Sequence, residues 1–296
     1  MLSSLSLILV SFAPGLFLIW FYVRLDKTRP EPWRLIVSTF ALGGLATFPA
    51  FMIHRPLELF LNGDSLPVAM SPLWSLLVLH LLIIGPVEEL CKFAAVRFGP
   101  YRSLYFDEPL DGMVYAAIAS LGFASVENFD YVLEYGPEIM LARAPLSTFA
   151  HLVFASVWGY ALGQHYASGE QRGRRLVGSL ALAAALHGLF NVLVSYESWV
   201  PLLIAGLYPL IGGVWIYRAF RKGDASSPYL TRRNHPLIQC KQCDQTFKFV
   251  TPNCPHCGAR RPWISVVAHL ICGNCSDRSP GDALFCASCG DELLRK

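Results

Sequence analysis

The chain has 296 residues, of which 54% are hydrophobic and only 15% are charged. Soluble domains carry about 25% charged residues, so this composition excludes most water-soluble classes and indicates a protein that lies largely in a membrane. The small net charge of +3 hides an uneven distribution, because residues 1–222 consist mostly of long apolar runs while residues 223–296 have the composition of a small soluble tail.

Seven apolar segments are long enough to cross a bilayer, which takes about 20 residues. These segments are residues 3–23, 35–53, 72–96, 111–132, 147–167, 176–195 and 199–217. No basic residues precede the first segment, and it is too long for the apolar part of a cleavable signal, so we expect it to remain as a helix. The pattern predicts an all-α polytopic membrane protein with about seven transmembrane helices.

Lysine and arginine are distributed unevenly over the connections between these segments. On alternate sides they number 12 against 2, and the two on the poorer side are Arg55 and Arg143. By the positive-inside rule, we expect an integral protein of the cytoplasmic membrane with its N-terminus outside and its C-terminal tail in the cytoplasm. A soluble all-α protein with buried helices would make this alternation accidental.

Four of the apolar segments carry residues that hydrocarbon rejects. A charged side chain at a bilayer centre costs roughly 2.5–3.5 kcal/mol on insertion scales, so several such residues make sense if they converge on one polar pocket. They are Glu88, Glu89 and Lys92 in the third segment, Glu127 and Asn128 in the fourth, His151 in the fifth, and His187 and Asn191 in the sixth. Carboxylates, imidazoles and an amide can activate water, so the set predicts an intramembrane hydrolase.

The acids of the third segment follow Gly85-Pro86, which should kink the helix. Glu88 and Glu89 are about 100° apart around a helix, so one can face a substrate while the other pairs with a partner. Lys92 lies within reach of either acid. A structural ion pair between helices is the alternative explanation of this cluster.

The other polar residues have similar alternatives. Glu127 shares a helix face with Phe123 and Tyr131, or else it is an interfacial acid near the outer end of its span. His151 opens the fifth span and His187 lies inside the sixth, where a single histidine is often only a packing residue. Glu127 and His151 are expected near the outer ends of their spans, and His187 near the middle of its span. At about 1.5 Å per residue, straight helices would place the polar residues at depths in the membrane that differ by more than about 10 Å. The Gly85-Pro86 kink or a tilt of the helices must therefore bring them closer together.

Two chemistries suit this set of residues. In the first, a glutamate activates water while imidazoles and the Asn191 amide stabilise the oxyanion. In the second, histidine and glutamate hold a catalytic zinc ion that activates a bound water. No His-Glu-x-x-His run, no Gly-x-Ser-x-Gly motif and no paired intramembrane aspartates are present.

The order Glu88-Glu89-x-x-Lys92, Glu127-Asn128, His151 and His187-x-x-x-Asn191 resembles the motifs of the PrsW family of bacterial intramembrane proteases. The resemblance covers about residues 5–220. That family is similar to the wider CAAX-protease and bacteriocin-processing superfamily.

The resemblance implies that the chain cleaves a membrane-anchored protein substrate, such as an anti-sigma factor. It also implies which residues are catalytic: Glu88, Glu89, Glu127, His151, His187 and Asn191. A non-catalytic membrane adaptor or immunity-type protein, in which the polar residues only lock the helices together, is the alternative.

Eight of the nine cysteines lie in the tail, in two groups of four offset by 32 residues. The groups are Cys240, Cys243, Cys254 and Cys257, followed by Cys272, Cys275, Cys286 and Cys289. This Cys-x2-Cys spacing predicts two zinc ribbons, each holding one structural zinc ion. Disulfides would be unusual in a reducing compartment, and pairing the second half of one group with the first half of the next would break the repeat.

The tail divides into a linker at 223–236 and ribbons at 237–262 and 263–296. The two ribbons together carry seven Lys or Arg residues against five Asp or Glu residues. Because this is no dense basic stripe, nucleic acid is not expected as a partner. A cytoplasmic protein bound by the ribbons is the expected partner.

Overall fold

The computed structural model describes most of the chain, and the residues it describes form two compact units, Met1–Phe220 and Arg221–Lys296. The described residues are 3–25, 31–62, 72–103, 105–106, 108–168, 173–196 and 198–226, and in the tail 237–239, 242–243, 246–248, 257, 269–271, 274–275 and 278–280.

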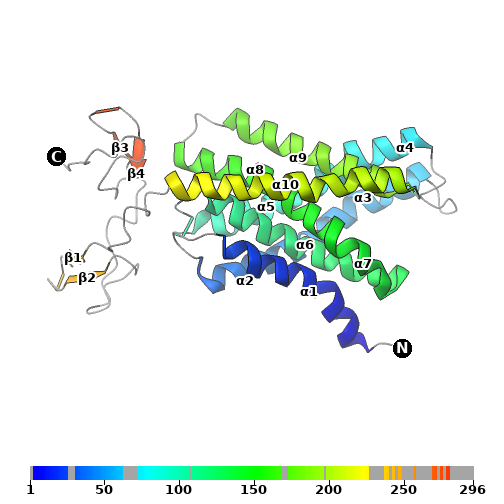
Figure 1. The fold of residues 1–296 in the computed structure, drawn as a ribbon, viewed down its shortest axis with the longest axis horizontal. Helices are drawn as coiled ribbons and strands as arrows, with labels where there is room; N and C mark the ends of the chain where they lie inside the picture. The colour runs from blue at the N-terminus through cyan, green and yellow to red at the C-terminus, as the bar shows by residue number, and fades with distance from the viewer. Residues whose placement is uncertain are drawn as a thin grey trace. The chain divides into compact units, whose positions relative to one another are not determined.

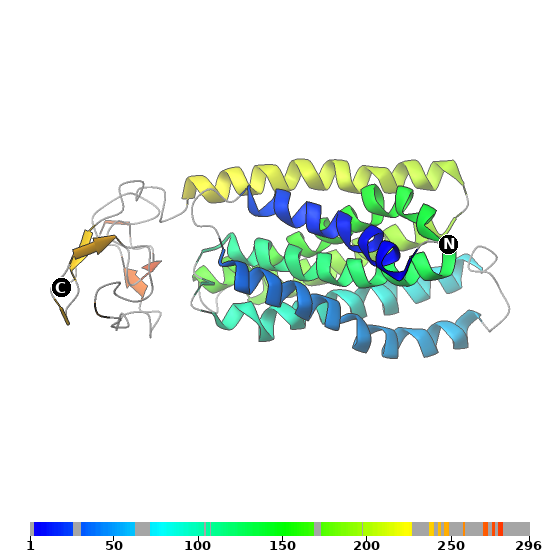
Figure 2. The ribbon, with the colours of Figure 1, turned by 90° about the horizontal axis from the view of Figure 1, so that it is seen from below.

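The first unit is a bundle of long helices that run up and down along one axis (Figures 1 and 2). The helices are α1 (Ser4–Val23), α2 (Trp33–Leu45), α3 (Thr47–Asn62), α4 (Leu73–Leu77), α5 (Gly85–Phe98), α6 (Asp111–Tyr135), α7 (Met140–Arg143), α8 (Phe149–Ser168), α9 (Gly173–Val194) and α10 (Trp199–Ser226). Single turns of 3-10 helix follow α5 at Pro100–Arg102 and α6 at Pro137–Ile139.

Among the described residues of this unit, two π-helical segments interrupt the α-helices, and each contains or precedes a proline. Val78–Ile84 joins α4 to α5, directly before Gly85-Pro86, and Ala144–Thr148 joins α7 to α8 around Pro145. A proline lacks the N–H that would continue the α-helical ladder, and a π-helical turn absorbs that loss while keeping the helix continuous.

Helix α6 is the central element, since it packs against α1, α2 and α8. Its residues from Asp111 to Ser125 are all buried. The small residues of α8 allow the close approach, because a Cβ placed on Gly159 or Gly163 would collide with the backbone of Gly112 or Pro109. The small-residue ridge of α8 is therefore a packing surface against α6.

Six helical stretches among the described residues are long and apolar enough to cross a membrane. They are Ser4–Val23, Trp33–Leu61, Leu73–Arg102, Pro137–Tyr166, Gly173–Val194 and Trp199–Lys222. The remaining predicted span, the fourth (111–132), corresponds to α6, which does not meet this criterion. Because α6 faces protein on nearly all sides, its surface does not need the composition that lipid requires of an exposed helix.

The fifth predicted span, 147–167, was too short at its start. The helical stretch runs from Pro137 to Tyr166, so His151 lies near its middle, and the expectation that His151 lies near the outer end is wrong. Arg143 was expected in the connection before this span, but it is buried and hydrogen-bonded, and Pro145 after it is part of a π-helical turn.

The described part of the tail contains two short antiparallel hairpins. One pairs β1 (Leu237–Gln239) with β2 (Thr246–Lys248), and the other pairs β3 (His269–Ile271) with β4 (Arg278–Pro280). Equivalent strands are offset by 32 residues, the same offset as the cysteines. The predicted ligands Cys240, Cys254, Cys272, Cys286 and Cys289 lie outside the described residues, so the zinc ribbons stay a prediction.

Candidate active site

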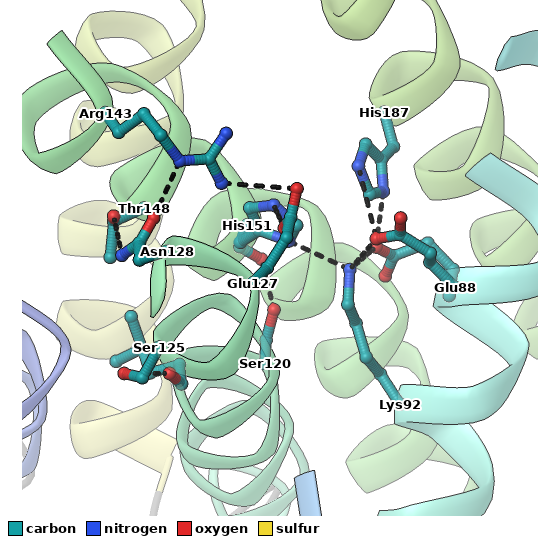
Figure 3. A network of polar contacts seen from close by, with 12 residues as sticks. Glu88, Lys92, Ser120, Ser125, Glu127, Asn128, Arg143, Thr148, His151 and His187 are labelled. Atoms are coloured by element: carbon teal, nitrogen blue, oxygen red, sulfur yellow. Dashed lines mark hydrogen bonds and ion pairs between the residues drawn. The ribbon is translucent and has the colours of Figure 1, made fainter. Parts of the chain in front are cut away.

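The Lys92 ammonium is the centre of a buried polar network (Figure 3). Its Nζ donates hydrogen bonds to Glu89 Oε1 at 2.8 Å and to Glu88 Oε2 at 3.3 Å. A third hydrogen bond reaches His151 Nδ1 at 2.9 Å, and the Phe123 ring centroid is 4.4 Å away. One lysine thereby connects both acids of α5 to a histidine of α8.

The Glu89 carboxylate accepts hydrogen bonds from several side chains and has no exposed surface. Besides Lys92, its carboxylate accepts from Trp158 Nε1 at 2.8 Å and from His187 Nδ1 at 2.9 Å. Glu88 is held less tightly, since His187 Nε2 lies 3.7 Å from its Oε2. Glu89 therefore anchors the network, and Glu88 is the acid that has capacity left for a substrate or water.

Backbone contacts place His187 beside these acids. Gly85 N–H donates to the carbonyl of His80, which closes the π-helical segment. A Cβ at Gly85 would collide with the carbonyl of Ala184, and a Cβ at Gly188 would collide with the carbonyl of His80. Because these two glycines have no side chain, the backbone of α9 can contact the backbones of α5 and of the π-helical segment before it. This close approach brings His187 within reach of both acids.

A second branch of the network reaches His151 from α6. Glu127 Oε2 lies 3.0 Å from His151 Nε2, and Glu127 Oε1 lies 3.2 Å from Arg143 Nη2. The Arg143 guanidinium lies 3.7 Å from the Tyr131 ring centroid, and its Nε donates to Asn128 Oδ1 at 2.8 Å. Glu127 and Tyr131 therefore share a face, as predicted.

The two imidazoles face different partners. An ammonium can only donate, so His151 Nδ1 accepts from Lys92, and its Nε2 lies on the Glu127 side. His187 Nδ1 lies within hydrogen-bond distance of Glu89, whereas its Nε2 is at an ion-pair distance from Glu88. The two rings lie edge to face with centroids 4.8 Å apart.

Most of the residues that the sequence singles out meet in this network. Glu88, Glu89, Lys92, Glu127, His151 and His187 are joined by the contacts above, so the expected spread in depth does not separate them. Asn128 lies one step away, with its amide bonded to Thr148 and to the carbonyl of Ser11. The side chain of Asn191 makes no hydrogen bond to any residue that the structure describes, while its backbone carbonyl accepts from Ser195.

Two members of the network were missed from the sequence. Arg143 was assigned to an outer loop by the charge count, yet it is 7% exposed and pairs with Glu127. Trp158 was not singled out, although it follows His151 by two helical turns on the same face of α8. That spacing from a polar residue was the available signal for Trp158.

Three residues of the network could also hold a metal ion. Glu88, His151 and His187 each offer a ligand atom, and these atoms lie within 4.8 Å of one another. Two imidazoles and one carboxylate form the ligand set of many catalytic zinc sites, so the residues fit zinc in type and spacing. The Lys92 ammonium bonds to Glu88 Oε2 and His151 Nδ1, so these two atoms are available to a metal only if Lys92 moves.

Comparison with known proteins places the chain in a family. The model of the PrsW family intramembrane metalloprotease matches residues 31–217. Protease PrsW of Geobacillus kaustophilus is 33% identical over 235 residues, which are 79% of this chain and 98% of that protein. Protease PrsW of Bacillus subtilis is 30% identical over 198 residues, which are 66% and 86% of the two chains. No solved structure matches.

Proposed function

We propose, since the chain belongs to the PrsW family of intramembrane proteases, that it hydrolyses a peptide bond of a membrane-anchored protein with Glu88 as the base that activates water. The observation that carries this proposal is the convergence of two acids, a lysine and two histidines from three helices in one buried network. An anti-sigma factor with a single membrane span is an example of the substrate class.

The residues of the network divide the work of hydrolysis. Glu88 accepts the proton of the attacking water, and Lys92 orients its carboxylate. His187 donates to the developing oxyanion or to the leaving amine. Glu127 fixes the tautomer of His151, much as an acid orients the histidine of a catalytic triad. The amide of Asn191, one helical turn beyond His187, is a further donor for the oxyanion.

A metal ion would change how the water is activated. If zinc binds, Glu88, His151 and His187 would hold it, and it would supply a Lewis acid for the scissile carbonyl and the bound water. Glu89, Trp158 and Glu127 would then keep the two imidazoles oriented, as groups behind metal ligands commonly do.

A non-catalytic adaptor is the second candidate function. It is favoured by the three hydrogen bonds of the Lys92 ammonium to Glu88, Glu89 and His151, because these bonds use all of its donors and join α5 to α8. In that case, removing the charge of Glu88 would destabilise the fold, and neither the wild type nor the variant would cleave a substrate.

Cleavage in reconstituted membranes separates the two candidates. The full chain is placed in proteoliposomes with a single-span anti-sigma factor, and wild type is compared with Glu88→Gln. Glu138→Gln is the matched control, because Glu138 is an exposed acid in the 3-10 turn after α6 and lies outside the network. We expect wild type and the control to cleave and Glu88→Gln to lose at least about 10³-fold in turnover. Equal cleavage by all three proteins would contradict the proposed role of Glu88.

A further inference from the structure

The residues at the centre of the site are almost completely enclosed. Glu88 is 4% exposed, His151 is 3% and His187 is 1%, and Glu89 and Lys92 have no exposed surface. Peptide hydrolysis consumes a water molecule for each bond broken. A route through the bundle must therefore bring water to Glu88.

Aromatic rings close the bundle at the end where α5 stops and α6 begins. Phe93 packs edge-on against Trp158 with ring centroids 5.5 Å apart. Beyond them, Tyr101, Phe106 and Tyr166 form a cluster in which each ring contacts the other two. Tightly packed rings leave little space for water, so this end does not supply the route.

Two further histidines lie on the opposite side of the site, and the proposed chemistry does not use them. His54 of α3 and His80 of the π-helical segment are each 8% exposed. Neither ring nitrogen of His80 has a hydrogen-bond partner in the described part of the chain, and Nδ1 of His54 has none there either. A buried polar group without a partner costs about 1–3 kcal/mol, and water is the usual partner of such groups.

His80 connects the site to His54. It is close enough to both His187 and His54 to interact electrostatically with them. Its own carbonyl lies against Gly188, the neighbour of His187. The π-helical segment also packs against α3, so the three imidazoles follow one another from the active site towards α3.

Charged residues continue this line to the surface. Arg55, the neighbour of His54, pairs with Glu58 at 3.0 Å and has a side chain that is 62% exposed. Arg55 also interacts electrostatically with Asp130 and Glu134 of α6. We name these four charged residues of α3 and α6 the charged rim. A rim of this kind lies in water and not in hydrocarbon.

We infer that water reaches Glu88 through a polar passage between α3, the π-helical segment and α6, which opens at the charged rim and is lined by His54 and His80. Ala50 and Phe123 are buried and pack together with Cys91, so this apolar contact offers water no polar partner. The inference rests on the proposed function, because only a hydrolase needs water at Glu88.

Cysteine accessibility tests the passage without any cleavage assay. His54→Cys and His80→Cys proteins in lipid nanodiscs are treated with a charged methanethiosulfonate reagent, and labelling is followed by peptide mass spectrometry. The controls are Leu79→Cys, at a buried apolar position, and Leu82→Cys, at a position that is 70% exposed on the lipid-facing surface. A thiol needs water to form the reactive thiolate, so we expect both histidine positions to react at least about tenfold faster than both controls.

A second measurement uses the unmodified protein, in case a cysteine variant does not fold. Deuterium exchange at the imidazole C2 position reports whether water reaches each histidine, and half-buried His165 provides the reference. We expect His80 to exchange within about tenfold of His165. A His80 that is about 100-fold slower, or a His80→Cys thiol no faster than the controls, would overturn the passage. If the protein cleaves its substrate while His80 exchanges slowly, only the passage is refuted. If His80 exchanges rapidly but no cleavage occurs, only the proposed function is refuted.

Discussion

Arg143 holds in place the second branch of the network, which reaches His151 through Glu127 of α6. Its guanidinium contacts Glu127, Asn128 and the Tyr131 ring at the same time. Glu127 in turn faces His151 Nε2. Loss of the guanidinium would leave Glu127 Oε1 without its charged partner in a largely enclosed place, which is costly in a low-dielectric interior.

We therefore expect Arg143→Gln to lower the turnover of the membrane-anchored substrate by about 10–100-fold. It should also lower the free energy of unfolding by about 3–5 kcal/mol. Arg143→Lys keeps the charge and should recover part of both losses. Arg174→Gln, at an exposed position of α9, is the control. Wild-type turnover and stability in Arg143→Gln would show that Glu127 does not need this partner.

At the same scale, the sequence predicted most of the residues that meet in the network, because charged and polar groups in apolar segments are rare enough to stand out. Glu88, Glu89, Lys92, His151 and His187 were found in this way. Arg143 was not, because it lies between two predicted spans, where a basic residue is expected to belong to a loop. Only tertiary packing shows that its charge is neutralised inside the bundle.

The two π-helical segments are the elements that assemble the site. One precedes the acids of α5 and the other precedes His151, so each rotates the functional residues relative to the turns before them. A kink at Gly85-Pro86 was predictable from the missing proline N–H. The second segment was not predictable in the same way, because its proline was assigned to a connection.

Close packing of α5 on α9 is the second requirement at this scale. A Cβ at Gly188 would collide with the carbonyl of His80, whereas a Cβ at Gly178 of the same helix would meet nothing within 4 Å. We expect Gly188→Ala to push the helices apart, to reduce turnover, and to lower the free energy of unfolding by about 1–3 kcal/mol. Gly178→Ala is the matched control and should behave as wild type in thermal unfolding and cleavage. Equal effects of the two substitutions would contradict this packing account.

For the whole molecule, the orientation in the membrane stays a prediction from charge. Removing Arg143 from the count of loop residues strengthens the asymmetry, since the residue is buried in the bundle. We expect reporter fusions at Ser226 to indicate the cytoplasm and fusions at Asn62 to indicate the outside. The opposite result at both positions would reverse the topology.

The tail is expected to bind two structural zinc ions. Its two hairpins repeat at the offset of the cysteine groups, which supports this expectation. Metal analysis of the full chain should find about two zinc ions in the tail, and Cys240→Ser and Cys272→Ser should each remove one. Cys91→Ser, in α5, should remove none. A further zinc ion that is lost in His187→Ala would locate a metal in the membrane site, and a tail without zinc would refute the ribbons.

The central claim is that Glu88 and His187 act as parts of one catalytic unit. Turnover of the single-span substrate in proteoliposomes is measured for wild type, Glu88→Gln, His187→Ala and the double variant. The losses in turnover caused by substituting residues that act as a unit do not add up in free energy. We therefore predict that each single substitution lowers turnover at least about 10³-fold, and that the turnover of the double variant is within about threefold of that of the less active single variant. Losses that multiply in the double variant, or single variants that retain wild-type turnover, would contradict the account.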